Sequence, residues 1–306
     1  DHNEIALLPP SLPRLTALTL LDVSHNGLKS LPHKLGHMVG LQELYAHNNE
    51  LTFVPPSIET CTNLHTLAFS NNLLSELPYG VCHLTNLTHL SVKNNHIAVL
   101  SPGLSQNILL VALELEDNPI ADPPLLVLEQ GFKAVMAYLQ RMFDVRKTGH
   151  VDLRDLELKD MPADLLGVLR VGDSAESRPS TAGSKKGRRK KGPAPIKKLS
   201  LTGNKLEYLP AFVGELSSLR ELTMDENLVE PPLHIRTEGI SMMQGYLRRI
   251  VTAKAQLSLD LRGMLLKDVQ LHYYKLQSLT SCDLGSNLLT SVPDEVFRYT
   301  DLSWLD

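Results

Sequence analysis

Leucine and asparagine recur along the chain with a period of 23 residues. Six asparagines keep this spacing: Asn3, Asn26, Asn49, Asn72, Asn95 and Asn118. Around each complete member the pattern reads L-x-x-L-x-L-x-x-N-x-L-x-x-L-P, as in Leu64, Leu67, Phe69, Asn72, Leu74, Leu77 and Pro78. A fixed period of this length predicts one structural coil per repeat, with each coil stacked on its neighbours.

Each 23-residue coil is predicted to contain one short parallel strand. Successive side chains of a strand point to opposite faces, so the leucines point inward and the residues between them face the concave surface. The asparagine amide can bond backbone groups where the coil bends away from the strand. The predicted fold class is therefore α/β: a curved solenoid with one parallel strand per turn on the concave face and helical or irregular segments on the convex face.

Two stretches replace the repeat with helical periodicity. Residues 124–146 place Phe132, Val135 and Leu139 on one helical face, after two prolines that suit a first helical turn. Residues 232–253 repeat this arrangement 108 positions later. The pairs that align without a gap include Pro123/Pro231, Gly131/Gly239, Tyr138/Tyr246 and Leu139/Leu247. We therefore predict two helical insertions, at 124–146 and 232–253, that arose by duplication.

A basic segment interrupts the ladder after its first helical stretch. Leu156 occupies an asparagine position, and the next asparagine, Asn204, follows 48 residues later, which is one repeat plus 25 residues. Removing residues 171–195 restores the phase. We therefore predict an insertion within one continuous solenoid domain, residues 1–306, that is open at both ends. The Gly, Ser, Pro, Lys and Arg content of the insertion predicts disorder.

These motifs carry a resemblance to a known family. The repeat, with Leu-Pro after the strand, resembles the Ras-suppressor-like intracellular leucine-rich repeats. Two segments are similar to the element that closes the repeat arrays of leucine-rich-repeat-containing protein 40 and of Roco-type proteins. They are NPIADPPLLVLEQGFKAVMAYLQRM and its second copy, NLVEPPLHIRTEGISMMQGYLRRI. The resemblance implies a leucine-rich repeat solenoid that binds proteins, often in signalling. Roco proteins follow their repeats with a GTPase, but the phosphate loop G-x-x-x-x-G-K-[ST] does not occur in this sequence.

The repeat register identifies the side chains of the concave face. The candidates for partner binding are Tyr45, His47, Glu114, Glu116, Asp117, Asp152, Arg154, Asp155, Asp225 and Asp260. Carboxylates dominate this set. One interpretation is a solvated face that keeps the protein soluble. The other is a docking groove for a protein with a basic face, whose approach the carboxylates steer, with Tyr45 as an anchor at the less charged end.

Six cations gather in the predicted insertion: Lys185, Lys186, Arg188, Arg189, Lys190 and Lys191. Several interpretations stay open. They are a solvated loop, a nuclear import signal, docking on the chain's own acidic face, and weak contact with an anionic partner such as RNA, lipid headgroups or acidic protein tails. No aromatic residue is interleaved with these cations, so any nucleic-acid contact is expected to be nonspecific.

The sequence contains no pattern typical of catalysis or metal binding. Its 12 histidines and its three cysteines (Cys61, Cys82 and Cys282) lack ligand spacing, so we expect no metal and no cofactor. Cys61 and Cys282 occupy leucine positions of the ladder, which predicts buried thiols. No nucleophile elbow and no run of 18 apolar residues occurs. We therefore expect no enzyme activity, no small-molecule substrate and no membrane span.

Three functions remain open from the sequence. The first is a non-catalytic scaffold or adaptor for protein–protein interaction, in intracellular signalling or assembly, that binds through the acidic concave face. The second is a localisation or assembly element whose basic loop contacts an anionic polymer or surface. The third is the recognition domain of a larger enzyme. The cysteines form no disulfide framework, which favours a reducing compartment and a cytoplasmic, and also a nuclear, location.

Overall fold

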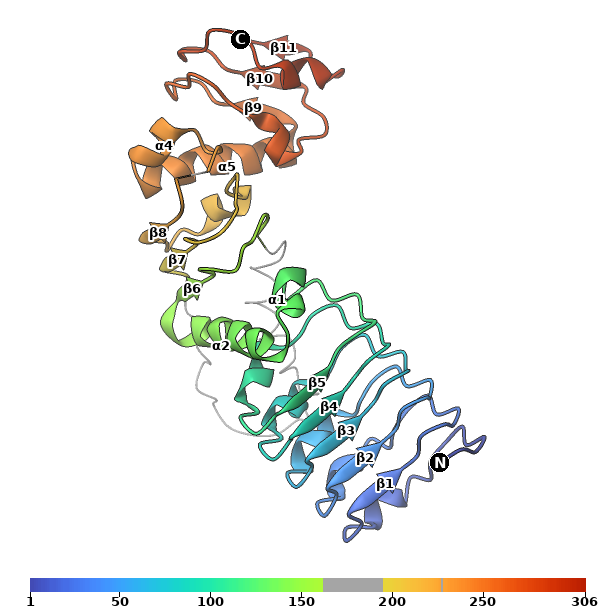
Figure 1. Cartoon of the computed structure of the whole chain (residues 1–306). Coiled ribbons are helices and arrows are strands. Elements are labelled where there is room, and N and C mark those ends of the chain that lie inside the picture. The colour runs from blue at the N-terminus through green and yellow to red at the C-terminus, as the bar shows by residue number, and fades with distance from the viewer. Residues whose placement is uncertain (162–194, 227) are drawn as a thin grey trace, which may run out of the picture. The chain divides into compact units, whose positions relative to one another are not determined.

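The computed structural model describes residues 1–161, 195–226 and 228–306. These residues form two compact units, one of residues 1–147 and one of residues 148–161 and 195–306 (Figure 1). The predicted basic insertion, residues 171–195, lies outside the described residues except for Pro195. The single continuous solenoid predicted for residues 1–306 stays a prediction.

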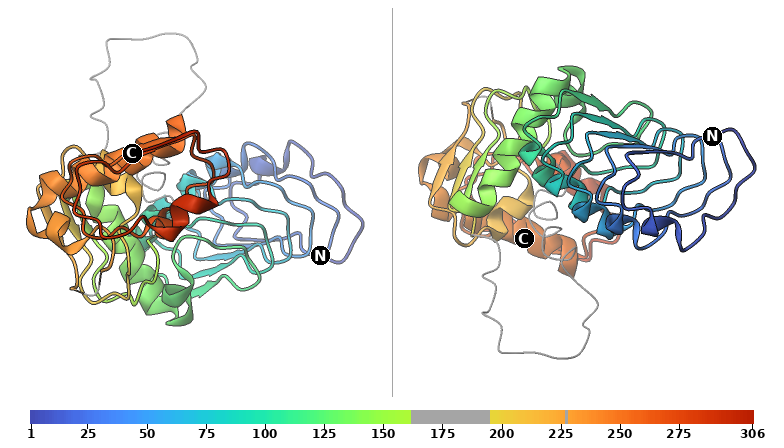
Figure 2. Two further views of the ribbon diagram at one scale, coloured as in Figure 1. Left: turned by 90° about the horizontal axis from the view of Figure 1, so that it is seen from above. Right: turned by 90° about the horizontal axis from the view of Figure 1, so that it is seen from below.

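The first unit is a stack of coils (Figure 2). Its strands form one parallel sheet in the order β1-β2-β3-β4-β5 (Figure 1). The strands are β1 Leu20–Asp22, β2 Glu43–Tyr45, β3 Thr66–Ala68, β4 His89–Ser91 and β5 Ala112–Glu114. Neighbouring strands pair residues that are 23 positions apart, such as Leu21 with Leu44 and Leu44 with Leu67. The sequence period and the strand register are therefore the same.

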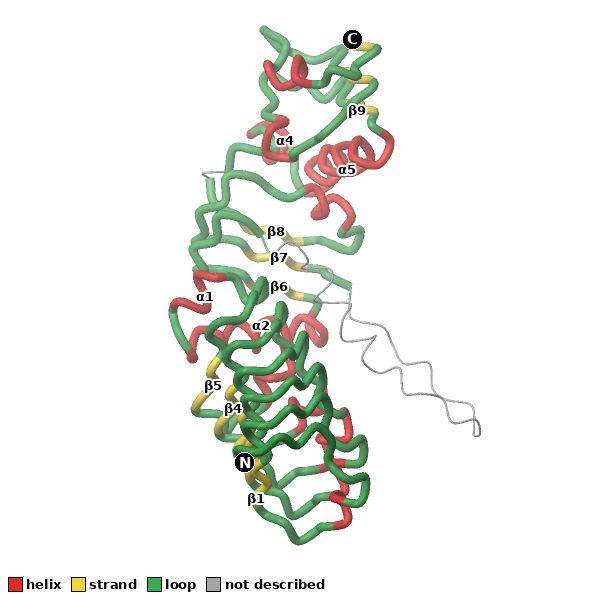
Figure 3. Tube along the Cα trace, turned by 90° about the vertical axis from the view of Figure 1, so that its right-hand side faces the viewer, coloured by secondary structure: helices red, strands yellow, loops and turns green. Residues whose placement is uncertain are grey.

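The chain returns to the next strand through a short 3-10 helix on the other side of each coil. Figure 3 shows the strands of the first unit along one side and these helices along the other. They are η1 Leu12–Arg14, η2 Leu35–His37, η3 Pro56–Thr60, η4 Tyr79–His83 and η5 Pro102–Gln106. Three of the five have a proline directly before or at their first residue, where its fixed φ is accommodated (η3, η4 and η5).

The leucines of the repeat form the core between strands and 3-10 helices. Leu44 and Leu67, which pair across β2 and β3, are both 0% exposed. All three cysteines are buried free thiols, as the ladder predicts for Cys61 and Cys282. Burial raises the pKa of Cys61 and of Cys282 to about 11, so both remain protonated at neutral pH.

The ladder asparagines bond the backbone where each coil bends, as predicted. The Asn72 Oδ1 accepts from the backbone N–H of Leu51 at 2.9 Å, and its Nδ2 donates to the carbonyls of Ala46 at 3.0 Å and Phe69 at 2.9 Å. The same three-way bridge between coils occurs at Asn49, Asn95, Asn118, Asn204 and Asn287. One amide thus satisfies three backbone groups that would otherwise be left without partners.

The second unit contains two three-stranded parallel sheets, in the orders β6-β7-β8 and β9-β10-β11. The strands are β6 His150–Asp152, β7 Lys198–Ser200, β8 Glu221–Thr223, β9 Ser258–Asp260, β10 Ser281–Asp283 and β11 Trp304–Leu305. Their 3-10 helices are η6 Ala211–Glu215, η7 Leu271–Tyr274 and η8 Asp294–Arg298. β6 pairs directly with β7. The strand before the segment outside the described residues and the strand after it are therefore neighbours.

Each unit includes one long helix preceded by a single helical turn. Where the sequence predicts helices at 124–146 and 232–253, the chain forms α1 Leu125–Glu129 with α2 Phe132–Thr148, and α4 Leu233–Thr237 with α5 Ile240–Gln256. Helix α5 lies against η6, where its Arg248 Nε donates to the carbonyl of Gly214 at 2.7 Å. A Cβ at position 214 would lie 2.7 Å from the backbone nitrogen of Arg248, so only glycine permits this approach.

Each of the two long helices, α2 and α5, has a buried tyrosine that donates a hydrogen bond to a buried carboxylate. Tyr138 of α2 donates to Asp122 at 2.6 Å, and Tyr246 of α5 donates to Glu230 at 2.9 Å. Both carboxylates directly precede a cis-proline, and both lie in the turn between the last strand and the helices. The two acids are 108 positions apart, like the two tyrosines, so they belong to the same duplicated arrangement.

Candidate partner-binding surface

The strand face of the first unit is built by the alternation of buried leucines and outward polar side chains. In β2, Leu44 is buried while Glu43 and Tyr45 on either side of it are half-buried on the opposite face. The Tyr45 hydroxyl donates to Glu43 Oε2 at 2.6 Å, and this bond raises the pKa of Tyr45. The predicted anchor Tyr45 therefore lies on the expected face with its hydroxyl already bonded.

One end of this face carries three histidine rings. His2 stacks on His25 with ring centroids 3.9 Å apart, and His25 meets His47 edge to face at 5.1 Å. Burial lowers the pKa of His47, and the neighbouring His25 lowers it further. His47 is therefore neutral at physiological pH, and three aromatic rings lie together at this end of the face.

The other end of the face carries exposed carboxylates. Glu114 accepts from the Ser91 hydroxyl at 2.7 Å. Within the described residues, the side chains of Glu116 and Asp117 make no hydrogen bond and no ion pair. Lys93 lies one coil earlier at the position equivalent to Glu116, and its ammonium likewise has no ion pair with any described residue. The three carboxylates predicted here lie together and are available to a partner.

The residue directly before each described asparagine position of the ladder, including the position filled by Leu156, adopts a left-handed backbone conformation. Its φ is +53° at His25, +54° at Asn48, +56° at Asn71, +52° at Asn94, +57° at Asp117 and +58° at Asp155. Short polar residues and glycine tolerate this region best, and Gly203 fills the same position in the second unit. The backbone conformation alone therefore favours aspartate at positions 117 and 155, whether or not these side chains bind a partner.

The predicted carboxylates of the second unit are mostly bonded within it. Asp152 receives a two-pronged contact from Arg154, with Nε–Oδ1 and Nη2–Oδ2 distances of 2.9 and 2.8 Å. Asp260 pairs with Arg249 of α5 at 3.1 Å. Asp225 accepts from the backbone N–H groups of Gly203 and Asn204 at 3.1 and 3.0 Å. Only Asp155 of this group has a side chain without such a bond to another described residue.

Several of these internal partners were not identified from the sequence. Lys198 of β7 pairs with Glu221 of β8 at 2.8 Å, and the two residues are 23 positions apart in register. The repeat alignment could therefore have found this pair. Arg249 could not have been found in that way, because it lies on α5, outside the repeat.

The six cations of the predicted basic loop, Lys185, Lys186, Arg188, Arg189, Lys190 and Lys191, lie outside the described residues. Their interpretations as a nuclear signal, a docking segment or an anionic-partner contact therefore stay predictions.

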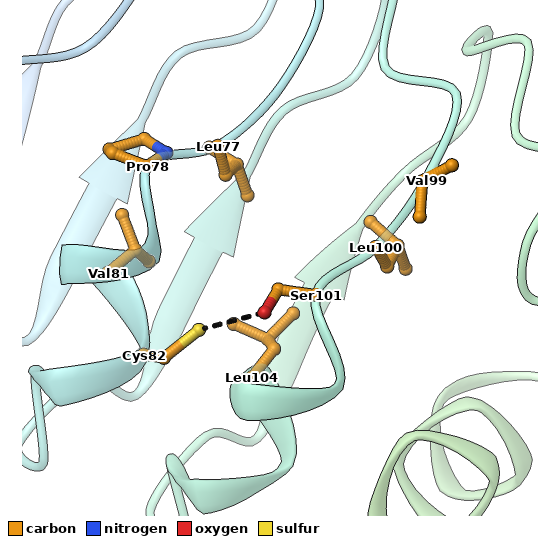
Figure 4. A pocket seen from close by; sticks show the side chains of 8 residues that line it. All are labelled: Leu77, Pro78, Val81, Cys82, Val99, Leu100, Ser101 and Leu104. Atoms are coloured by element: carbon orange, nitrogen blue, oxygen red, sulfur yellow. Dashed lines mark hydrogen bonds between the residues drawn. The ribbon is translucent and has the colours of Figure 1, made fainter. Parts of the chain in front are cut away.

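A small apolar cavity lies between η4 and η5 of the first unit, lined by Leu77, Val81, Leu100 and Leu104 (Figure 4). Its volume is about 10 Å³, and Cys82 Sγ donates to Ser101 Oγ at its side at 3.6 Å. A space of this size holds at most one water molecule. It is a packing gap between coils, too small for a ligand.

Among the described residues, no three His, Cys, Asp or Glu side chains come together in an arrangement that could hold a metal ion. None of the described helices combines the length and the apolar character needed to cross a bilayer.

The comparisons with known proteins identify the repeat type. Residues 39–79 match the family described as Leucine Rich repeats (2 copies). The match covers β2, β3 and the turns at Asn49 and Asn72. Together with the parallel one-strand coils, it confirms the predicted α/β fold of a leucine-rich repeat solenoid. Leucine-rich repeats generally present an extended surface to protein partners.

Solved structures resemble the chain at low similarity. Internalin C2 from Listeria monocytogenes is 26% identical over 38% of this chain and 49% of its own, with a TM-score of 0.35. InlJ from the same organism is 17% identical over 99% of this chain and 51% of its own (TM-score 0.37). The leucine-rich repeat ectodomain of the receptor kinase GASSHO1/SCHENGEN3 from Arabidopsis thaliana is 21% identical over 98% of this chain and 28% of its own (TM-score 0.37). This chain spans about half or less of each. No curated protein matches it.

Proposed function

We propose that the chain is a non-catalytic, intracellular scaffold or adaptor that binds a protein partner on the strand face of its first unit. A basic segment of the partner docks at Glu114, Glu116 and Asp117. The histidine end of the face, with Tyr45 and His47, receives the less charged part of the partner.

The observation that carries this proposal is the difference between the two sets of carboxylates. Asp152, Asp225 and Asp260 in the second unit already have partners within the chain. Glu116 and Asp117 in the first unit have none among the described residues. Carboxylates that have no cation bonded to them within the chain are free to steer and orient a basic partner.

The geometry of the sheet sets the size of the docking segment. β2 and β5 are three strand spacings apart, which is roughly 14 Å at the usual distance between strands. An extended segment of roughly five residues covers that distance. A partner segment of this length could contact Tyr45 at one end and Glu114 at the other.

A charge reversal with a matched control tests the proposal. A lysine- and arginine-rich peptide of extended conformation is titrated into the full chain, into Glu114→Lys/Glu116→Lys and into Glu76→Lys/Glu129→Lys. The control carries the same change in charge at exposed positions away from the strands. We expect the strand-face variant to bind at least roughly tenfold more weakly and with a flatter dependence on salt. If both variants weaken binding equally, the loss comes from the change in net charge, and the proposed site at Glu114 and Glu116 is wrong.

The other two functions stay predictions from the sequence. A localisation role rests on the cations at 185–191, which lie outside the described residues. A role as the recognition part of a larger enzyme depends on a catalytic part outside this sequence.

A further inference from the structure

A cleft of about 500 Å³ lies in the second unit, away from the strand face. Three segments line it: residues 159–160 after β6, residues 205–208 after β7, and residues 272–275 of η7 and its C-cap. A volume of this size is within the range of sites for small ligands or single side chains. The leucines and ladder asparagines hold the repeat together, and none of them lines this cleft.

One wall of the cleft is a fixed pair of tyrosine rings. Tyr208 and Tyr273 stack with centroids 5.3 Å apart and an angle of 23° between their planes. Tyr208 also meets the buried Tyr274 edge to face at 6.2 Å, which ties the pair to the core of the unit. Both rings of the pair are half-buried, so part of each faces solvent. A held aromatic surface of this kind is suited to stacking against a planar ring.

Two carboxylates of the cleft lie beside the tyrosine hydroxyls. Tyr273 donates to Glu207 at 3.0 Å. Burial raises the pKa of Tyr208 to about 12, and the neighbouring Asp160 carboxylate adds to this effect. The Tyr208 hydroxyl therefore remains protonated at neutral pH.

Two lysine ammonium groups at the cleft have no partner within the described chain. Lys205 is paired with Glu157 at 2.8 Å. The side chains of Lys159 and Lys275 make no hydrogen bond or ion pair with any described residue. Lys275 caps η7 in the left-handed conformation, with φ at +49°, so its backbone position is fixed beside the rings. The cleft therefore offers two ammonium groups that are not engaged within the described chain.

We propose that this cleft binds a phosphomonoester carried on a planar ring. The ring stacks on the Tyr208–Tyr273 pair, and the phosphate receives hydrogen bonds from the ammonium groups of Lys159 and Lys275. The lysine ammonium group donates hydrogen bonds to phosphate as a point charge. The face of an aromatic side chain stacks against planar rings of different chemical structure. A phosphotyrosine side chain and a purine nucleotide share this chemistry.

The test uses phosphotyrosine and AMP as probes of these two sources, each titrated into the full chain by calorimetry. Tyrosine, adenosine and inorganic phosphate are titrated in parallel. The variant is Lys159→Ala/Lys275→Ala, and the matched control is Lys133→Ala/Lys267→Ala, which removes two exposed lysines elsewhere. All four substitutions are on the surface, and the thermal midpoint of each variant verifies that it is folded.

We expect saturable binding of at least one phosphorylated probe. The loss of either the phosphate or the two cleft lysines should weaken it at least roughly tenfold, and the control variant should leave it unchanged. Tighter binding of phosphotyrosine indicates a phosphorylated protein as the source, and tighter binding of AMP indicates a nucleotide. The absence of saturable binding by both probes overturns the proposal. So does inorganic phosphate binding as tightly as either probe, or unchanged binding in the Lys159→Ala/Lys275→Ala variant.

Discussion

Glu230 is a buried carboxylate without a cation bonded to it in the described structure. It is 1% exposed, and it accepts from the hydroxyls of Tyr246 at 2.9 Å and Tyr274 at 3.3 Å and from the backbone N–H of Gln270 at 2.7 Å. Burial raises the pKa of Glu230 to about 7, although these donors lower it in part. One side chain thus connects α5, η7 and the turn after β8, and it changes charge near neutral pH.

The raised pKa of Glu230 predicts a pH dependence of stability. In the unfolded chain the group titrates near 4.5, so the folded state holds the proton more tightly. The stabilisation is complete below pH 4.5 and is lost as the pH rises through about 7, a difference of about 3 kcal/mol in the free energy of unfolding. Glu230→Gln should remove this difference and should be more stable than the parent at pH 8. Urea unfolding of both proteins at pH 5 and pH 8 measures it.

The control for this prediction is Glu207→Gln, at an exposed carboxylate of the same unit that also accepts from a tyrosine. Its pH dependence should stay close to that of the parent protein. If Glu230→Gln loses stability equally at pH 5 and pH 8, Glu230 is ionised at both pH values and the description of its environment is wrong.

Some properties of individual residues could be predicted from the repeat. The ladder asparagines, the buried thiols and the outward direction of Tyr45 follow from position in a 23-residue repeat. The apolar period does not predict the left-handed position before each asparagine, although the run His25, Asn48, Asn71, Asn94 and Asp117 consists of residues that favour it. A carboxylate selected for backbone conformation and a carboxylate selected for binding look alike in a sequence.

At the scale of elements, the contact of α5 with η6 depends on one glycine. A Cβ at Gly214 would lie 2.7 Å from the Arg248 nitrogen and 2.9 Å from the Leu247 Cβ. Gly214→Ala should therefore displace α5 and lower the free energy of unfolding by about 1–3 kcal/mol. Chemical denaturation of the full chain measures this loss.

Gly245, within α5, provides the opposite case. A Cβ at this position meets no atom within 4 Å, and the residue has no positive φ. Gly245→Ala should raise the free energy of unfolding by about 1 kcal/mol, because alanine favours the helix more than glycine does. A loss of stability in both variants would contradict the packing described for α5.

The elements with a strong period could be predicted, and the bonds between them could not. The strand period and the helical stretches at 124–146 and 232–253 are visible in the order of apolar residues. The acid–tyrosine pairs Asp122–Tyr138 and Glu230–Tyr246 depend on how a helix lies against a turn, which no period encodes. The alignment of the two helical stretches contained a clue, since the acids recur at the same 108-residue offset as the tyrosines.

At the scale of the whole molecule, the two units differ in how they use charge on the strand face. In the second unit, Arg154, Arg249 and Lys198 neutralise carboxylates at distances of 2.8 to 3.1 Å. In the first unit, the carboxylates at the β5 end have no such partners among the described residues. The repeat register predicts both sets of carboxylates on the strand face and does not distinguish between them. The two sets of carboxylates differ in whether cations of the same chain are bonded to them, and this difference is not visible in the register.

The most direct test of the binding proposal is a map of the contacted residues. The full chain is titrated with the basic peptide and followed by amide shifts in ¹H–¹⁵N spectra, with Glu114→Lys/Glu116→Lys as the comparison. The account predicts that the largest shifts lie in β4, β5 and residues 116–117, and that they disappear in the variant. Shifts concentrated in the second unit, or unchanged in the variant, would contradict it.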